Sequence, residues 1–474
     1  MRIVVAGGGI SGLAAAFAIK TGAEEKGLPI SLTLLERETR LGGKIWSIRD
    51  EGFLCEWGPN GFLDNKPLTL ELCEELGVSD RLLSSRDEAR KRFIYAKGRL
   101  HQLPESGPAF FTSNLLSLRG RLRIIGELWA RKPPEGVDET LAAFARRRLG
   151  AEALDMLVGP MVSGIFAGDP ERMSLKSCFP RIAELEAQYG GLIRAMIQIQ
   201  KEKKKEGNGN KPQAGPAGPG GKLTSFSGGL EDIIDFLARA LPGMVRTSAA
   251  VTGIEKVPTG ETPYLLHLND GAETIPADVV IWAIPAYVAA DLLGSLDKEC
   301  GETLGQIPYS SLSVVCFGYK ESAMPMPLDG FGFLIPEKEK KKILGTLWDS
   351  SIFPGRAPEG FVSLRSMAGG AAHPEYGLLD SDKIIANTRA ALKEIMGIEA
   401  APDFVKVFPH EKAIPQYTVG HGARVARLET ILKEQLPGFF LTGNAFHGIG
   451  INDCVASGRA AARRVLDFIG QAPR

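Results

Sequence analysis

The chain is 474 residues long, which exceeds the usual size of one domain and predicts two or three. Lysine plus arginine and aspartate plus glutamate both number 56, and this balance argues against a general nucleic-acid binder. The six cysteines are scattered without a CxxC pair, and neither they nor the six histidines form a metal-ligand cluster in the sequence, so we expect reduced thiols and no bound metal.

The first segment, residues 1–65, alternates strand and helix. An apolar run at 3–6 predicts a buried parallel strand, an alanine-rich run at 10–21 predicts a helix, and 31–36 predicts the next strand. The first strand begins at Ile3 without a charged segment and an apolar core before it, so no signal peptide is expected.

A glycine motif connects the first strand to the helix. Gly7 permits the tight turn, Gly9 lets the backbone approach a pyrophosphate, and Gly12 lets the helix pack against the strand. The pyrophosphate is then expected at the positive end of the helix dipole, where Ile10 and Ser11 begin the helix. The motif predicts a bound dinucleotide.

Two features after the second strand specify that dinucleotide further. Glu36 ends the strand, where its carboxylate can accept hydrogen bonds from a ribose and disfavours a phosphate on it. Arg40 then opens a second glycine turn, in which Gly42 and Gly43 let more backbone approach the cofactor. An ordinary turn explains this pair equally well when it is taken alone. Together with the first motif, it favours FAD over NAD.

The middle of the chain turns helical. Helical spacing occurs at 67–76 and at 137–149, where Asp138 can cap the helix. Between them, 115–129 mixes large apolar residues with Arg119, Arg121 and Arg123. Lysine, glycine, proline and asparagine dominate the following segment, and 206–222 is expected to be a mobile surface loop.

Strand signals resume after this loop. The expected strands are 249–257, 264–268, 279–283, 308–318, 330–336, 343–348 and 361–367. A helix is expected at 381–396, with Ser381 as its cap. The longest apolar stretch, 279–293, is interrupted by Pro285 and Asp291 and is too short to span a bilayer, so any membrane contact is expected to be peripheral.

The end of the chain returns to the opening pattern. Gly443 closes a strand, and Gly450 with Ile451 opens a helix whose N-terminus, beside a flavin ring, would stabilise negative charge on the reduced flavin. Gly443, Gly450, Ile451 and Asn452 are assigned to the cofactor site, although capping this helix is the favoured role for the side chains of Asn452 and Asp453. One cofactor is therefore expected between the two ends of the chain.

These elements predict a combined α/β and α+β fold. A discontinuous Rossmann-like FAD domain is expected from 1–85, 223–300 and 437–474. A helical insertion at 86–205 and a mixed-sheet substrate domain at 301–436 interrupt it.

The chain resembles the amine-oxidase-like FAD superfamily and, within it, the protoporphyrinogen oxidases, over essentially its full length. The segments that carry the resemblance are 58–62, 92–95, 164–169, 330–336, 414–417 and 450–454. The resemblance implies oxidation of protoporphyrinogen IX to protoporphyrin IX in haem biosynthesis, with FAD as cofactor and O2 as acceptor, giving hydrogen peroxide. The implied step is hydride transfer from a bridging carbon of the substrate to flavin N5.

The resemblance also implies substrate-binding residues. Arg92 matches an arginine that pairs with a substrate propionate, which a guanidinium can grip bidentately. Leu334 and Leu347 match apolar residues that sandwich the macrocycle, and Met367 matches the position opposite. Gly168 matches a glycine lining the pocket, where a side chain would crowd the ring.

Further cofactor contacts are implied at Gly58, Pro59, Asn60 and Val251. No catalytic acid or base is assigned. His447 lies nearest in sequence to the second glycine turn, but an ordinary hydrogen-bonded histidine fits its position equally well.

Members of the resembled family are peripheral membrane proteins, which implies a cytoplasmic chain attached to the inner face of the cell membrane through its helical insertion. The residues that could form an amphipathic interfacial surface are Phe110, Phe111, Leu115, Leu116 and Trp129 with the nearby arginines. A core helix with a solvated basic side explains any one of them equally well. A homodimer and a contact with ferrochelatase are left open.

Three alternative functions fit parts of the pattern. A coproporphyrinogen III oxidase of the same fold would handle four propionates and should prefer extra cationic groups at the pocket mouth. An amine oxidase or a carotenoid desaturase would share the glycine motifs. A non-enzymatic membrane flavoprotein would show no pocket beside Arg92, Leu334 and Leu347.

Overall fold

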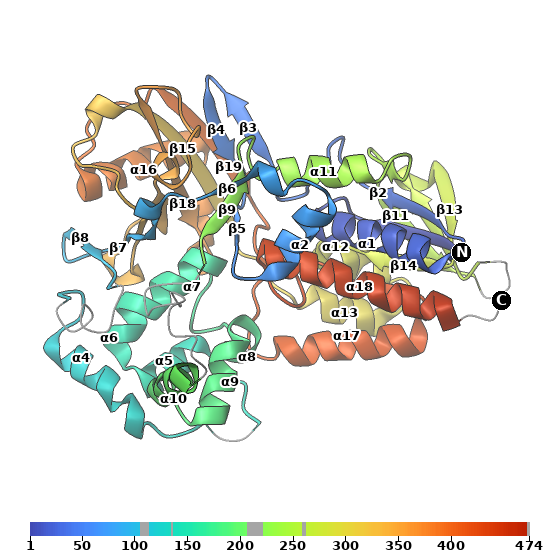
Figure 1. Cartoon of the computed structure of the whole chain (residues 1–474), viewed down its shortest axis with the longest axis horizontal. Helices are drawn as coiled ribbons and strands as arrows, with labels where there is room; N and C mark the ends of the chain where they lie inside the picture. Colours follow the sequence, from blue (N-terminus) through green and yellow to red (C-terminus); the bar gives the residue numbers. More distant parts are fainter. Residues whose placement is uncertain (105–112, 134–135, 206–220, 258–261, 472–474) are drawn as a thin grey trace.

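The computed structural model describes residues 1–104, 113–133, 136–205, 221–257 and 262–471. They form three parts: a nucleotide-binding-like lobe that carries both chain termini, a second lobe built on a mixed sheet, and a group of helices beside that sheet (Figure 1). The predictions made for Phe110, Phe111 and the loop at 206–220 fall outside the described residues.

The first lobe is built on a five-stranded parallel sheet in the order β10-β2-β1-β14-β20. Its strands are β1 (Arg2–Ala6), β2 (Ser31–Leu35), β10 (Val245–Arg246), β14 (Val279–Trp282) and β20 (Phe439–Leu441). They come from the beginning, the middle and the end of the sequence. Near-continuous apolar runs form such strands because helices and further strands cover both faces of the sheet.

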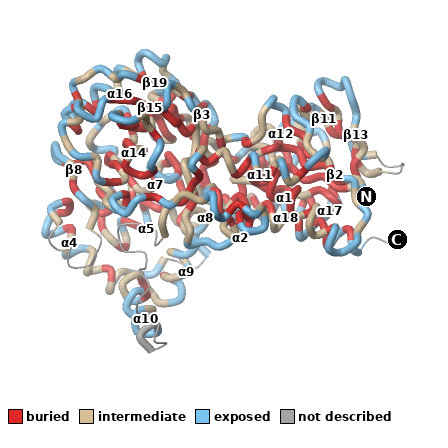
Figure 2. Tube along the Cα trace, turned by 45° about the horizontal axis from the view of Figure 1, so that its top comes forward, coloured by how far each residue is buried: buried red, intermediate tan, exposed pale blue. Residues whose placement is uncertain are grey.

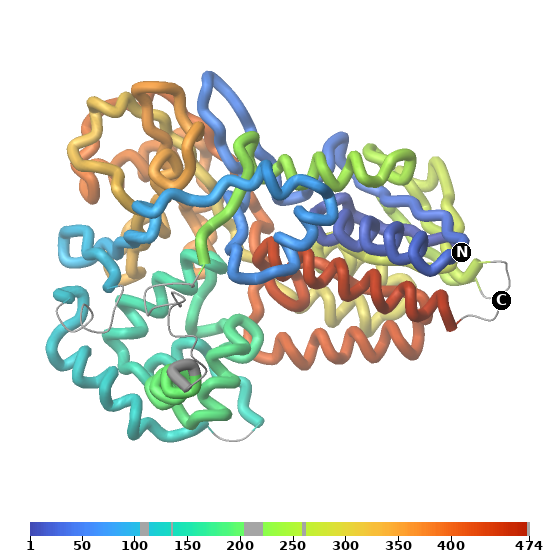
Figure 3. Tube along the Cα trace, in the orientation of Figure 1, coloured from blue at the N-terminus to red at the C-terminus, as the bar shows by residue number. Residues whose placement is uncertain are grey.

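Two helices from opposite ends of the chain lie side by side on this sheet. They are α1 (Ile10–Lys26) and α18 (Ile451–Gln471), and Figure 3 shows the first and last segments running together. A Cβ on Gly458 of α18 would come within 2.4 Å of the Ser11 carbonyl oxygen, so a glycine is needed at this crossing. The alanine-rich sequence of α1 permits this close approach, because small side chains let two helix backbones come together.

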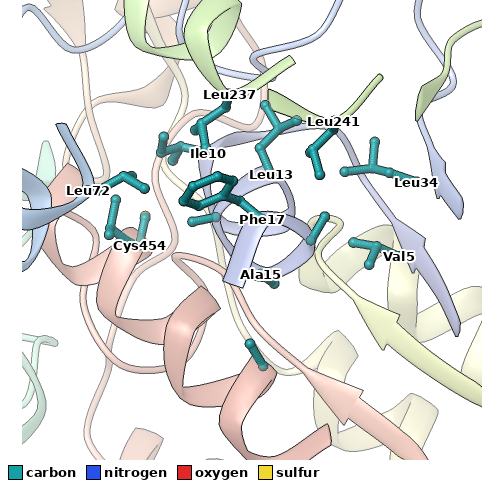
Figure 4. Packing of buried hydrophobic residues seen from close by; sticks show 14 of the residues in the cluster. Val5, Ile10, Leu13, Ala15, Phe17, Leu34, Leu72, Leu237, Leu241 and Cys454 are labelled. Atoms are coloured by element: carbon teal, nitrogen blue, oxygen red, sulfur yellow. The ribbon is translucent and has the colours of Figure 1, made fainter. Parts of the chain in front are cut away.

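The core of the lobe surrounds the first turns of α1. Ile10, Leu13 and Phe17 pack against Leu72 of α2 (Pro67–Glu75) and against α11 (Asp232–Ala240), with Cys454 of α18 completing the contact (Figure 4). Most residues of α1 and of the parallel sheet are buried (Figure 2). The start of α1 is therefore held rigidly.

The second lobe contains a seven-stranded mixed sheet in the order β19-β15-β18-β17-β16-β7-β8. Its strands are β7 (Arg92–Ala96), β8 (Arg99–Gln102), β15 (Leu312–Lys320), β16 (Gly332–Leu334), β17 (Gly345–Leu347), β18 (Phe361–Gly369) and β19 (Phe404–His410). Residues 92–102 thus belong to this sheet, although the sequence assigned them to the helical insertion. Helix α16 (Ser381–Met396) packs its apolar side chains on one face of the sheet.

The helical part contains α4 (Leu118–Ile125), α5 (Leu141–Arg148), α7 (Gly159–Phe166), α9 (Pro180–Tyr189), α10 (Leu192–Lys205) and shorter turns. Arg148, which is fully buried, pairs with Glu127 and Glu186 and joins these helices. A buried arginine is tolerated because both carboxylates compensate its charge. Of the helices in the described ranges, none combines the length and the apolar character needed to cross a membrane.

Leu115 and Leu116, which the sequence placed on an interfacial surface, are instead buried at 1% and 3% exposure. They precede α4 and pack against Ile94, Ala96 and Met156. The exposed apolar residues of this region lie further along the chain.

Two helix caps differ from the expected ones by one or two residues. Thr140 caps α5 by accepting from the Ala143 amide, whereas Asp138 accepts from the Ser174 hydroxyl and the Gly420 amide. Asp380, not Ser381, caps α16. In both places neighbouring polar residues could cap; Asp138 is instead engaged by two distant segments.

Candidate active site

The glycine turn between β1 and α1 has the geometry that each glycine requires. Gly7 has a φ of +111°, and a Cβ on Gly12 would lie 2.0 Å from the Gly7 carbonyl oxygen. A Cβ on Gly9 would meet nothing within 4 Å. No side chain in the described part of the chain caps α1, so its positive end is available to an anion beside Gly9.

The second glycine turn contacts the first. The Gly42 amide donates to the Gly8 carbonyl oxygen at 2.8 Å, and a Cβ on Gly43 would lie 3.5 Å from the Gly9 Cα. Arg40 holds this turn, because its guanidinium donates to the carbonyl oxygens of Leu41, Gly43 and Ile45 and stacks over Trp46. Arg40 therefore supports the cofactor site through the backbone.

Glu36 lies where the two glycine turns meet. One oxygen of its carboxylate accepts from the Gly8 amide at 2.8 Å and the other from the Glu38 amide at 2.9 Å. Each oxygen has a further lone pair, so the carboxylate can still accept from a ribose hydroxyl. The Ala249 amide donates to the Glu36 carbonyl oxygen and brings Val251, the first residue of β11 (Val251–Lys256), to the same end of the sheet.

The end of the chain completes this region. Gly443 has a φ of +124°, and its Cβ position is also open. Asp453 caps α18 by accepting from the Gly450 amide, which confirms that part of the sequence prediction. Asn452 does not cap the helix: its side chain accepts from the Thr69 hydroxyl and donates to the carbonyl oxygen of Leu63. Ile451 is buried in the core beneath the glycine turn, so its side chain packs rather than facing a ligand.

The loop at 58–60 contributes a polar group without a partner. The buried Nδ2 of Asn60 has no hydrogen-bond partner among the described residues. Gly58 lies so close to Lys44 that a Cβ would be 2.2 Å from the Lys44 carbonyl oxygen. Burial lowers the pKa of the Lys44 ammonium. Lys44 was not among the residues predicted for the site. The open glycine positions, the uncapped helix and the unpaired amide together fit FAD.

Tyr417 and His421 are two further residues that the sequence analysis missed as contributors to the site. The Tyr417 hydroxyl donates to the Asn444 carbonyl oxygen at 2.6 Å and accepts from the Gly448 amide at 2.8 Å. The His421 ring stacks on Tyr417 with centroids 4.0 Å apart. Both residues thereby fix the loop that precedes α18, but they come from a distant segment that sequence spacing does not connect to it.

Tyr417→Phe is expected to destabilise the fold by about 1–3 kcal/mol, because two backbone groups lose their partner. It should also weaken FAD binding, since the loop before α18 is no longer fixed. Thermal unfolding and the flavin content of the purified protein measure the two effects. Tyr264→Phe is the matched control: its buried hydroxyl bonds the Pro437 carbonyl oxygen away from the site, so stability should fall while FAD is retained. Equal flavin content in Tyr417→Phe and wild type would contradict the proposed role.

The mixed sheet brings the predicted substrate residues onto one face. Arg92, Leu347 and Arg365 lie in one row across the strands, joined through Gly332. Leu334 and Met367 lie in the adjacent row, joined through Gly345. Residues that pair across neighbouring strands point to the same side of a sheet. Arg92, Leu334, Leu347 and Met367 are each partly exposed, whereas the strands around them are largely buried.

Arg92 has no charge partner among the residues that the structure describes. Its guanidinium lies 5.1 Å from the centre of the Phe331 ring, and burial lowers its pKa. Burial is the sole cause of this shift, and no carboxylate of the described ranges opposes it. A partly buried guanidinium of this kind is stabilised by an anionic ligand.

Gly168 follows α7. Its neighbours in the protein, rather than a bound ring alone, leave no room for a side chain at this position. A Cβ there would lie 2.2 Å from the Met173 Sδ and 2.9 Å from the Gln416 Oε1. A side chain would therefore collide with the protein before it could crowd a bound ring. Helix α7 does approach the substrate face, because Gly164 packs against Leu334.

His447 lies at the surface rather than in the site. Its side chain is 55% exposed, and its Nε2 is 3.4 Å from a carboxylate oxygen of Glu429. This position gives no reason to assign it catalytic work.

Comparison with known proteins adds to this geometry. Residues 10–466 match the model of a family described as flavin-containing amine oxidoreductase. Coproporphyrinogen III oxidase of Bacillus subtilis is 31% identical, covering 99% of this chain and 98% of its own length. The chloroplastic protoporphyrinogen oxidase of Oryza sativa is 32% identical, covering 98% and 88%.

Solved structures show the same fold. A chain from Exiguobacterium sp., assigned to the protoporphyrinogen oxidases, is 26% identical with a TM-score of 0.82 and covers 99% of both chains. Putrescine oxidase superposes with a TM-score of 0.71 at 15% identity, which indicates a shared fold only.

Proposed function

Because the chain belongs to the family of flavin-containing amine oxidoreductases and, within it, to the FAD-dependent porphyrinogen oxidases, we propose that it oxidises protoporphyrinogen IX to protoporphyrin IX. O2 is the proposed acceptor and hydrogen peroxide the second product. FAD, when bound, supplies the two-electron oxidation chemistry.

The observation that carries this proposal is the position of the Arg92 guanidinium. It lies at the edge of a partly exposed apolar face and has no carboxylate partner within the described ranges. A porphyrinogen has this combination of properties, because it is a largely apolar macrocycle with propionate groups on its rim. A propionate on Arg92 would fix the macrocycle at one edge. Leu334, Leu347 and Met367 would then contact its apolar part.

The residues of the cofactor site would place FAD next to this face. The cradle formed by Gly9, Gly43 and Gly443 can take the cofactor between the two ends of the chain. Asn60 offers its unpaired Nδ2 as a hydrogen-bond donor. In this arrangement the protein contributes binding and orientation, which is how proteins commonly assist cofactor chemistry.

Coproporphyrinogen III is the second candidate substrate, because the Bacillus subtilis relative matches over nearly its whole length. The two substrates differ in their number of propionates. Protoporphyrinogen IX, with two, suits a face that is mainly apolar and on which Arg365 is paired with Asp349, so that Arg92 is the cation offered to a propionate.

The experiment that tests the proposal uses the purified yellow holoenzyme. Porphyrin fluorescence is followed from protoporphyrinogen IX and from coproporphyrinogen III, with peroxide measured in parallel. Faster porphyrin formation from protoporphyrinogen IX is expected. A preference for coproporphyrinogen III would replace the proposed substrate by the second candidate, and no porphyrin from either would overturn the function.

We further propose peripheral attachment to the inner face of the cell membrane. Leu118 and Leu122 are 66% and 58% exposed on α4, and Trp129 just beyond it is 77% exposed. Leu118 and Leu122 share one helix face because they are four residues apart. The arginines of the same helix would favour anionic headgroups.

Replacing Leu122 and Trp129 together by glutamate is expected to reduce binding to anionic lipid vesicles by at least about tenfold. The reason is that each buried apolar side chain contributes about 1.5–3 kcal/mol. Vesicle flotation measures the bound fraction. Leu378→Glu is the control, since Leu378 is similarly exposed, at 52%, but lies in the second lobe. Unchanged flotation of the double variant would exclude this surface as the attachment site.

A further inference from the structure

A cluster of four buried charged residues lies where β4 packs on the mixed sheet. Glu56 ends β4 (Phe53–Glu56), Asp349 and Arg356 lie between β17 and β18, and Arg365 is in β18. Their side chains are between 1% and 5% exposed. Burying four charged groups requires close pairing, and apolar residues in such a place often give equal or greater stability. The cluster therefore suggests a role beyond stability.

Arg365 connects the loop at 58–60 to the substrate face. Its Nη1 donates to the Gly58 carbonyl oxygen at 2.7 Å and to the Glu56 carbonyl oxygen at 3.3 Å. Its Nε lies 3.1 Å from a carboxylate oxygen of Asp349. In the sheet, Arg365 pairs with Leu347 and is two residues from Met367. The Arg365 side chain thus connects the loop at 58–60, which the proposed function places beside FAD, to the sheet face that it assigns to the substrate.

We infer that Arg365 is a positioning residue, which holds the loop at 58–60 at a fixed distance from β17 and β18 and so sets the placement of the porphyrinogen against the flavin. The inference rests on the proposed function. Gly58 tolerates little movement, because it is also packed closely against Lys44: a Cβ on Gly58 would lie 2.2 Å from the Lys44 carbonyl oxygen. A guanidinium suits this work, since it donates to the carbonyl oxygens of Glu56 and Gly58 while its charge pairs with the Asp349 carboxylate.

Arg356 provides a matched control within the same cluster. It is equally buried, at 2% exposure against 3% for Arg365, and its Nη1 lies 3.4 Å from Glu56. Its hydrogen bonds go to the Ser225 hydroxyl and the Phe226 carbonyl oxygen of β9 (Leu223–Phe226), not to the loop at 58–60. Replacing either arginine by lysine keeps the charge but removes the planar group of donors.

The test compares R365K and R356K as holoenzymes. The first measurement is the visible absorbance spectrum of the bound flavin without substrate, which reports its surroundings and does not depend on turnover. The second is the rate of flavin reduction by protoporphyrinogen IX under anaerobic conditions, measured against substrate concentration. R365K is expected to alter the spectrum and lower the limiting reduction rate by about tenfold or more, with half-saturation changed less than about twofold. R356K is expected to match the wild-type protein in its spectrum, its limiting reduction rate and its half-saturation concentration.

Equal behaviour of the two variants would overturn the inference, because the cluster would then act only through stability. If R365K does not fold, D349N is used in its place, because this variant keeps Arg365 but weakens the ion pair that holds its guanidinium. A wild-type spectrum and reduction rate in D349N would likewise overturn the inference. If neither porphyrinogen reduces the flavin of the wild-type protein, the proposed function is wrong. The substrate-free spectra would still decide whether Arg365 positions the loop beside the flavin.

Discussion

Arg92→Ala is expected to raise the KM for protoporphyrinogen IX by about 100-fold, with a smaller effect on kcat and none on FAD content. The reason is that the substrate propionate loses its charged partner, and truncating one member of a buried pair costs about 2–5 kcal/mol. About 3 kcal/mol corresponds to that factor. Steady-state porphyrin fluorescence gives KM and kcat, and the absorbance of the bound flavin gives FAD content.

Two further substitutions make the Arg92 experiment specific. Arg92→Lys keeps the charge but loses bidentate geometry, so an intermediate KM is expected. Lys91→Ala removes the adjacent cation, whose ammonium pairs with Asp329 at the surface, and should leave KM unchanged within about twofold. Loss of FAD from Arg92→Ala, with a wild-type KM in the remaining holoenzyme, would show that Arg92 serves the cofactor rather than the substrate.

Gly9→Ala is expected to yield a folded protein that has lost most of its FAD. Gly9 has an ordinary extended conformation, with φ −73° and ψ 173°, and its Cβ position is open, so alanine should fit the protein itself. The added methyl group would occupy the space that a pyrophosphate needs at the start of α1. Flavin content, circular dichroism and the rise in Tm on adding FAD measure the outcome.

Two other glycines distinguish the explanations for a loss of FAD. Gly470→Ala should keep both fold and FAD, because its Cβ position is also open but lies at the far end of α18. Gly12→Ala should lose both, because its Cβ would lie 2.0 Å from the Gly7 carbonyl oxygen. Full retention of FAD in Gly9→Ala would place the pyrophosphate elsewhere.

The sequence predicted the alternating strands and helix at the start of the first lobe well. Strands at 3–6 and 31–36 are confirmed with shifts of one residue at their ends, and the helix expected at 10–21 begins at Ile10 but runs five residues further, to Lys26. FAD as the cofactor is also confirmed by the family match. These predictions succeed because a glycine turn, an apolar run and a helix start are local features, and each constrains the backbone at its own position.

Other assignments required contacts between distant segments. Leu115 and Leu116 have the composition of an interfacial surface, but they are buried by strand β7 and by Met156. Residues 92–102 precede a helical region in sequence, yet they pair with β16 and extend the mixed sheet. Local composition does not distinguish these outcomes, because the burial of an apolar residue depends on what packs against it.

The sequence by itself determined the two glycine turns, the alternation that builds the parallel sheet, and the resemblance that singled out Arg92 and Met367. Only the tertiary structure decided that the two glycine turns touch, that Tyr417 fixes the loop before α18, and that Arg365 links the loop at 58–60 to the mixed sheet. The physical reason is the range of the interactions. A turn or a helix start depends on neighbouring residues, whereas a site assembled from segments hundreds of residues apart depends on strand register and side-chain packing, which spacing in the sequence does not encode.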